Sequence, residues 1–193
     1  MKQTFQREDR DQWSLRNQVS IFFIGFEEIA KFKVTDSSVT PSRYEYKNKF
    51  SKKRNSRLIF HPQTNSVVDA LHSDSILKLP EGALDKLSFQ LQLRHDVAML
   101  GDKFLQSEYH LVDRTKFKTY TVKNLGEEII DTPAGRFNAI KLQQKRVDKD
   151  KHTLIWLAKE LDYFVLRVER VENGESDFKI ELKSLEVDGE RRF

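Results

Sequence analysis

The chain contains no cysteine, and this absence excludes several kinds of functional site. Disulfide bonds, thiolate metal sites, iron–sulfur clusters and thiol catalysis all require that residue. Glycine is scarce as well: the seven glycines are dispersed, and the closest two, Gly126 and Gly135, lie nine positions apart. A phosphate-binding loop or a dinucleotide-binding turn needs glycines that are closer together. The sequence therefore excludes nucleotide-binding loops of these types.

No apolar run is long enough to cross a membrane as a helix. The longest run, residues 19–26 (VSIFFIGF), has eight residues, whereas the bilayer core requires about 20. The first ten residues, MKQTFQREDR, lack the apolar segment that is typical of a signal peptide. We expect either a cytoplasmic protein that starts at Met1 or an exported protein from which the signal peptide has been removed.

The chain has 193 residues, of which 38% are hydrophobic and 33% are charged. This length and apolar content are sufficient for a hydrophobic core, and they predict one domain over residues 1–193. We expect about residues 1–12 to be a flexible N-terminal segment. The same composition argues against a disordered, collagen-like or membrane-spanning protein.

Alternation of apolar and polar residues with a period of two dominates the sequence and predicts β-strands. It is clear in residues 15–23, 44–50, 105–111 and 137–147. Turn-forming residues separate the strands, notably Thr132-Pro133-Ala134-Gly135 and Asn173-Gly174. About ten short strands joined by short turns predict a mainly β protein. We expect an antiparallel meander that forms a barrel-like or strongly curved sheet.

One stretch, residues 84–100, fits either a strand or a helix. Alternating apolar residues favour a strand; they are Leu87, Phe89, Leu91 and Leu93. On a helix the same residues form two apolar stripes, which indicates a helix that is covered on two sides. Asp85 suits the N-cap position, and Gly101 suits the end of a helix. These caps and the length of about 15 residues favour one helix near residues 85–100.

Positive charge is concentrated between Arg43 and Arg57. Seven basic residues and one acidic residue, Glu45, give this 15-residue segment a net charge of +6. Residues 51–56 (SKKRNS) read as the tip of a hairpin. A solvated tip that discourages pairing between sheet edges is one explanation. The other is contact with an anionic surface, such as lipid headgroups, lipopolysaccharide phosphates, an acidic protein or, least favoured, nucleic acid. The residues expected to make that contact are Lys47, Lys49, Lys52, Lys53, Arg54 and Arg57.

The sequence contains no recognisable catalytic or metal-binding motif. The five histidines are scattered, and neither an HExxH nor a G-x-S-x-G pattern occurs. The nearest candidates for acid–base chemistry are His95, Asp96, Glu108 and His110. We therefore expect a protein without cofactor, metal or catalytic residues.

Three segments of the second half carry a family resemblance: residues 125–142 (LGEEIIDTPAGRFNAIKL), 155–158 (IWLA) and 163–169 (YFVLRVE). Together with residues 84–94 (LDKLSFQLQLR), they resemble the bacterial family catalogued as domain of unknown function 3108. The resemblance extends over about residues 84–182, and the T-P-A-G-x-F turn is its most specific part. It implies an exported, mostly β protein of the cell envelope, and it implies no catalytic residue.

These observations favour a non-catalytic β-scaffold of the bacterial cell envelope that binds an amphipathic ligand or a partner protein. The expected ligand contacts are Phe22, Phe26, Phe89 and Trp156, although Trp156 also fits the role of a core anchor. Two alternatives remain. One is an envelope hydrolase that acts on glycan or lipid, and the other is a nucleic-acid-binding barrel that uses the basic hairpin at residues 43–57.

Overall fold

The computed structural model describes residues 1–21, 24–35, 38–72, 76–114, 116–146, 149 and 151–192. Strands account for 62% of these residues, and one α-helix accompanies them. The predictions of a mainly β protein and of a single helix near residues 85–100 are therefore confirmed. The strands are β1 Lys2–Arg7, β2 Gln12–Ile21, β3 Ile24–Val34, β4 Val39–Asn48, β5 Ser56–His61, β6 Ser66–Asp69, β7 Ile76–Lys78, β8 Gln106–Asp113, β9 Lys116–Thr132, β10 Gly135–Lys145, β11 His152–Ala158, β12 Phe164–Glu172, β13 Glu175–Glu181, β14 Glu186–Val187 and β15 Glu190–Arg191. The helices are α1 Lys86–Leu100 and the short 3-10 turns η1 Lys52–Arg54, η2 Pro62–Thr64, η3 Gly101–Lys103 and η4 Lys159–Leu161.

The chain divides into two compact units. Unit 1 comprises Met1–Leu93 and Tyr109–Lys118, and unit 2 comprises Arg94–Glu108 and Thr119–Phe193. The chain passes from one unit to the other within α1, β8 and β9. Each unit has its own cluster of buried hydrophobic residues. That residues 1–193 fold as one domain stays a prediction.

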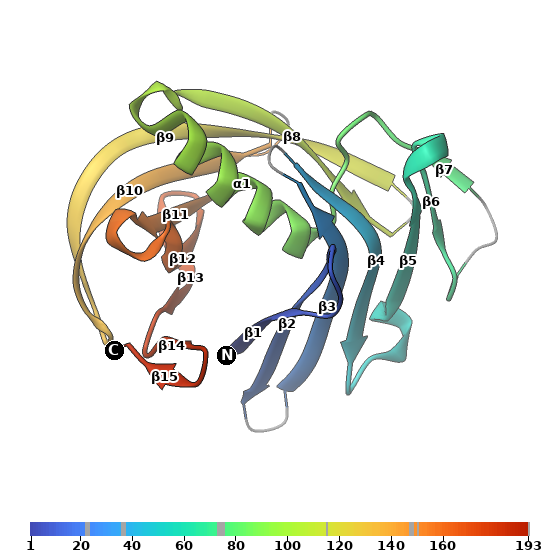
Figure 1. Ribbon diagram of the computed structural model, residues 1–193, viewed down its shortest axis with the longest axis horizontal. Coiled ribbons are helices and arrows are strands. Elements are labelled where there is room, and N and C mark those ends of the chain that lie inside the picture. Colours follow the sequence, from blue (N-terminus) through green and yellow to red (C-terminus); the bar gives the residue numbers. More distant parts are fainter. Residues whose placement is uncertain are drawn as a thin grey trace. The chain divides into compact units, whose positions relative to one another are not determined.

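Unit 1 contains a seven-stranded sheet in the order β1-β2-β3-β4-β5-β6-β7 (Figure 1). Every neighbouring pair is antiparallel and consecutive in sequence, so this part of the chain is a meander. Strand β1 lies within the N-terminal segment 1–12, whose flexibility stays a prediction.

Alternation determines which face of this sheet is buried. Leu15, Ala30, Tyr44 and Leu58 are successive cross-strand partners on β2 to β5, and all four are buried. Residues one position away in each strand point to the opposite face, as the period of two requires. This places the charged residues of β4 outside the core of unit 1.

Helix α1 begins where the sequence predicts. Asp85 caps it: Oδ1 accepts hydrogen bonds from the backbone N–H groups of Leu87 (2.8 Å) and Ser88 (3.0 Å), and Oδ2 accepts one from Ser88 Oγ (2.6 Å). The helix ends at Leu100, and the next residue, Gly101, has a φ of 52°. The capping residues therefore indicated correctly that residues 84–100 contain a helix and not a strand.

Unit 2 contains strands of a six-stranded sheet in the order β13-β12-β11-β10-β9-β8. The predicted turn at Thr132-Pro133-Ala134-Gly135 joins β9 to β10, and Gly135 has a φ of 139°. Phe137 follows it and is buried, as expected for the returning strand. Asn173 and Gly174, with φ values of 54° and 82°, form the predicted turn between β12 and β13.

The strand pairings do not support the barrel-like or strongly curved sheet that we expected. The larger sheet ends at β1 and β7 and the other at β13 and β8, and among the described residues no sheet is closed or strongly curled. Alternation indicates which residues share a face, and turns indicate which strands are neighbours. Closure depends on strand tilt and on the stagger of the hydrogen-bonding register, which a local pattern does not fix.

Candidate functional site

The basic segment folds as strands β4 and β5 with η1 between them (Figure 1). Arg43, Glu45 and Lys47 alternate along β4 and therefore share its outer face. Arg57 on β5 is the direct cross-strand partner of Glu45. Glu45 Oε2 lies 3.1 Å from Lys47 Nζ, Oε1 lies 3.1 Å from Arg57 Nε, and Arg43 also pairs with Oε1. One carboxylate thus neutralises part of the charge of three cations.

Glu45 is a well-buried carboxylate for a residue on the outer face of a sheet, with a relative exposure of 9%. Burial acts to raise the pKa of Glu45, but hydrogen bonds from Arg43 and Lys47 outweigh it and hold the pKa below its usual value. Glu45 is therefore ionised at neutral pH, and its ion pairs persist there.

The turn beyond these ion pairs is fixed by two asparagine side chains. Asn48 Oδ1 accepts hydrogen bonds from the backbone N–H groups of Phe50 and Ser51, both at 2.9 Å. Asn55 Oδ1 accepts one from the backbone N–H of Asn48 at 2.8 Å. These bonds tie the two ends of the turn together, so residues 49–54, called the basic tip below, are preorganised.

The basic tip presents four cations to solvent: Lys49, Lys52, Lys53 and Arg54. The aliphatic stem of Lys49 passes over Gly25, where a Cβ atom would lie 3.0 Å from Lys49 Cδ. No carboxylate among the described residues pairs with these four side chains. Phe50 lies between them in sequence and is 65% exposed.

The six cations predicted to contact an anionic surface thus fall into two groups. Lys47 and Arg57 are held by Glu45, whereas Lys49, Lys52, Lys53 and Arg54 extend from the basic tip. Sequence reasoning missed Glu45 as the centre of the first group. The alternation of Arg43, Glu45 and Lys47 was the signal that could have indicated it.

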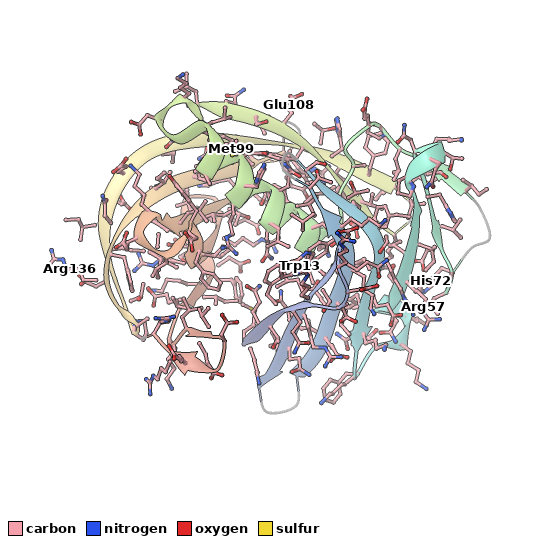
Figure 2. All side chains as sticks on the ribbon, viewed as in Figure 1. Trp13, Arg57, His72, Met99, Glu108 and Arg136 are labelled. Atoms are coloured by element: carbon pink, nitrogen blue, oxygen red, sulfur yellow. The ribbon has the colours of Figure 1, made fainter. Side chains whose placement is uncertain are left out.

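Asp69 secures the other side of β5. Its carboxylate accepts hydrogen bonds from the backbone N–H groups of Arg57 (3.0 Å) and Leu71 (3.2 Å) and from Ser56 Oγ (3.0 Å), and it lies 3.1 Å from His72 Nδ1. Figure 2 labels Arg57 and His72 near β5 and β6. Burial acts to raise the pKa of Asp69, but hydrogen bonds, chiefly those from the backbone N–H groups of Arg57 and Leu71, outweigh it and hold the pKa below its usual value. This network fixes the start of β5 next to the basic tip.

The aromatic residues expected to contact a ligand are divided between the units. Phe26 is half-buried in unit 1, with its ring centroid 5.6 Å from that of Tyr46. Phe89 is buried on α1 and meets Tyr109 edge-to-face at 5.1 Å. Phe22 lies outside the described residues. Ligand contact by these side chains stays a prediction.

Trp156 is buried in unit 2 within a row of charged neighbours. Lys141 and Arg167 are its cross-strand partners, and the charged end of each lies over the indole ring, 5.2 Å from its centroid. Trp156 Nε1 donates a hydrogen bond of 2.5 Å to Glu128 Oε1. The ring packs against the cluster of Ile130, Phe137 and Leu166, among others. These contacts describe a core anchor with a polar edge.

Arg94, the last residue of the LDKLSFQLQLR segment, packs within unit 2. Its guanidinium lies over Phe164, 5.0 Å from the ring centroid, and Nη2 donates to the backbone oxygen of Asp162 at 3.2 Å. Its Nε atom is buried and has no hydrogen-bond partner among the described residues. Burial lowers the pKa of Arg94. Arg94 thus links α1 to the turn before β12.

The candidates for acid–base chemistry do not form a group in one unit. His95, Asp96 and Glu108 belong to unit 2, whereas His110 belongs to unit 1, where its ring meets Phe117 edge-to-face. Within the described ranges, no group of three or more His, Asp or Glu side chains could hold a metal ion. No helix in the described part of the chain combines the length and apolar character needed to span a bilayer.

The comparisons with known proteins bear on the family alone. No curated protein and no solved structure matches the chain significantly. One family model matches residues 4–183, which includes almost all of both units. The match extends the resemblance seen over residues 84–182 towards the N-terminus, into the strands that carry the basic tip. The chain therefore belongs to the family described as protein of unknown function DUF3108.

Proposed function

We propose that this protein is a non-catalytic binding protein of the bacterial cell envelope, and that its basic tip contacts a phosphate-bearing anionic surface. One observation carries the proposal: the four cations of the basic tip are exposed and have no carboxylate partner among the described residues, whereas the inner cations are paired with Glu45. Unpaired cations at one tip create a positive potential that attracts an anionic surface. The bonds of Asn48 and Asn55 support this role, because a fixed loop loses little entropy on binding.

The test compares two triple variants that change the net charge equally. The tip variant is Lys52→Glu/Lys53→Glu/Arg54→Glu. The matched control is Lys116→Glu/Lys123→Glu/Lys183→Glu, which replaces exposed lysines elsewhere. Each protein is sedimented with vesicles of phosphatidylglycerol and phosphatidylcholine, or of phosphatidylcholine alone, at low and at physiological salt.

We expect the wild type and the control to bind the anionic vesicles and the tip variant to bind at least tenfold more weakly, since each cation near an anionic membrane is worth about 1 kcal/mol. Binding should also weaken as salt increases. Equal loss of binding in both variants would show a net-charge effect and would overturn the proposal. Tighter binding of the wild type to duplex DNA than to the vesicles would favour the nucleic-acid alternative.

A further inference from the structure

Phe50 is an exposed aromatic residue in the middle of the basic tip. Its side chain is 65% exposed, and among the described residues its ring takes part in no aromatic or cation–π contact. Its backbone N–H is held by Asn48 Oδ1 at 2.9 Å, so the position of the residue on the turn is fixed. The fold thus holds an apolar ring in water beside four unpaired cations. The free energy that burial of this ring would contribute is not gained within the protein.

The neighbouring aromatic residues do not extend this surface. Tyr44 is buried and donates a hydrogen bond of 2.8 Å to Glu28 Oε1. Tyr46 is packed against the core of unit 1 and faces Phe26. Single-stranded nucleic acids are usually bound by several aromatic rings on which successive bases stack. A single exposed ring among cations is better suited to the interface of an anionic bilayer, where aromatic rings lie at the level of the headgroups.

Resting on the proposed function, we infer that the anionic surface is a lipid bilayer and that Phe50 inserts into it. The ring enters the region between the headgroups, and the four cations of the basic tip contact lipid phosphates around it. The charge of the tip complements an anionic leaflet, and the ring adds apolar burial that a purely electrostatic contact lacks.

The first experiment removes the ring but keeps the charge. Phe50→Ser is compared with Phe178→Ser, which replaces another exposed phenylalanine, at 51% exposure on β13. We expect Phe50→Ser to reduce partitioning onto phosphatidylglycerol vesicles about tenfold, as the loss of part of an apolar burial predicts. Phe178→Ser should bind as the wild type does, and Phe50→Trp should restore binding. Melting curves identify any variant that fails to fold.

The second experiment locates the side chain and uses the absence of native cysteine. Phe50→Cys and Gln63→Cys are each labelled with a fluorophore that responds to polarity. Gln63 is exposed on η2, at the opposite end of β5 from the basic tip. We expect the label at position 50 alone to shift its emission to the blue on anionic vesicles and to be quenched by spin-labelled lipid.

The outcomes separate this inference from the proposed function. If the charge-reversed tip loses binding while Phe50→Ser binds normally and the label at position 50 remains in water, the proposed function stands and insertion is overturned. If charge reversal does not change binding, the proposed function itself fails. Loss of binding in both variants together with a blue shift at position 50 supports both.

Discussion

The Nε atom of Arg57 lies 3.1 Å from Oε1 of Glu45, its direct cross-strand partner on β4. Because Arg57 is paired with Glu45, it does not belong to the group of exposed, unpaired cations that follow Asn48 in the sequence. Lys47 and Arg43 share the same carboxylate, so three of the seven basic residues in the segment are partly neutralised. The surface that can contact an anionic partner is therefore limited to the four cations of the basic tip, fewer than the seven basic residues of the segment.

Replacing Glu45 with glutamine should release these cations. We expect Glu45→Gln to reduce the free energy of unfolding by about 1–2 kcal/mol, because three partly exposed ion pairs are lost. We also expect it to strengthen binding to phosphatidylglycerol vesicles several-fold, since one added positive charge is worth about 1 kcal/mol at such a surface. Urea denaturation and vesicle sedimentation measure the two effects. Glu81→Gln, at an exposed position in unit 1, is the matched control; an equal gain of binding there would contradict the prediction.

Asp85 should make stability depend on pH. Burial raises the pKa of Asp85 to about 6, from a value of 3.8 for the free side chain. Between pH 3.8 and about 6 the folded state therefore retains a proton that the unfolded state loses. The contribution of Asp85 to stability is fully present below pH 3.8 and is lost as the pH rises through about 6. Between these two pH values the free energy of unfolding falls by about 3 kcal/mol.

Asp85→Asn removes this titration and retains an oxygen that can accept the N–H groups of Leu87 and Ser88. We expect the stability of this variant, relative to the wild type, to increase from pH 4 to pH 7 and then to level off. Denaturation curves at unit pH intervals measure the difference. A difference that is constant with pH would show that Asp85 does not carry the titration.

Trp156 should report the ionisation of Glu128. The hydrogen bond from Trp156 Nε1 is the main cause that lowers the pKa of Glu128. In a Trp13→Phe background, Trp156 is the only tryptophan. We expect its emission to be constant from pH 7 to about pH 5 and to change below pH 4.5, where Glu128 becomes protonated. The same transition in a Trp13→Phe/Glu128→Gln protein would assign it to another group.

Local features of the sequence predicted local features of the fold. Asp85 and Gly101 marked the ends of α1, and Gly135 and Asn173-Gly174 marked two turns. Caps and turns depend on residues within a few positions of one another, so a single sequence reveals them. Alternation likewise predicted strands over residues 44–50 and 137–147, although of the aromatic residues that alternate over 44–50, Tyr44 is buried whereas Phe50 is 65% exposed. The extent of the β10 strand was also close to the expected 137–147.

The sequence by itself determined that this is a mainly β protein with one capped helix and a basic hairpin. It also determined that the protein belongs to the DUF3108 family. Only the tertiary structure decided which cations are paired, because the pairing of Glu45 with Arg57 depends on the register between β4 and β5. It also placed Tyr44 and Tyr46 against the core and left Phe50 exposed. Register and burial arise from contacts between residues distant in sequence, and a local pattern cannot supply them.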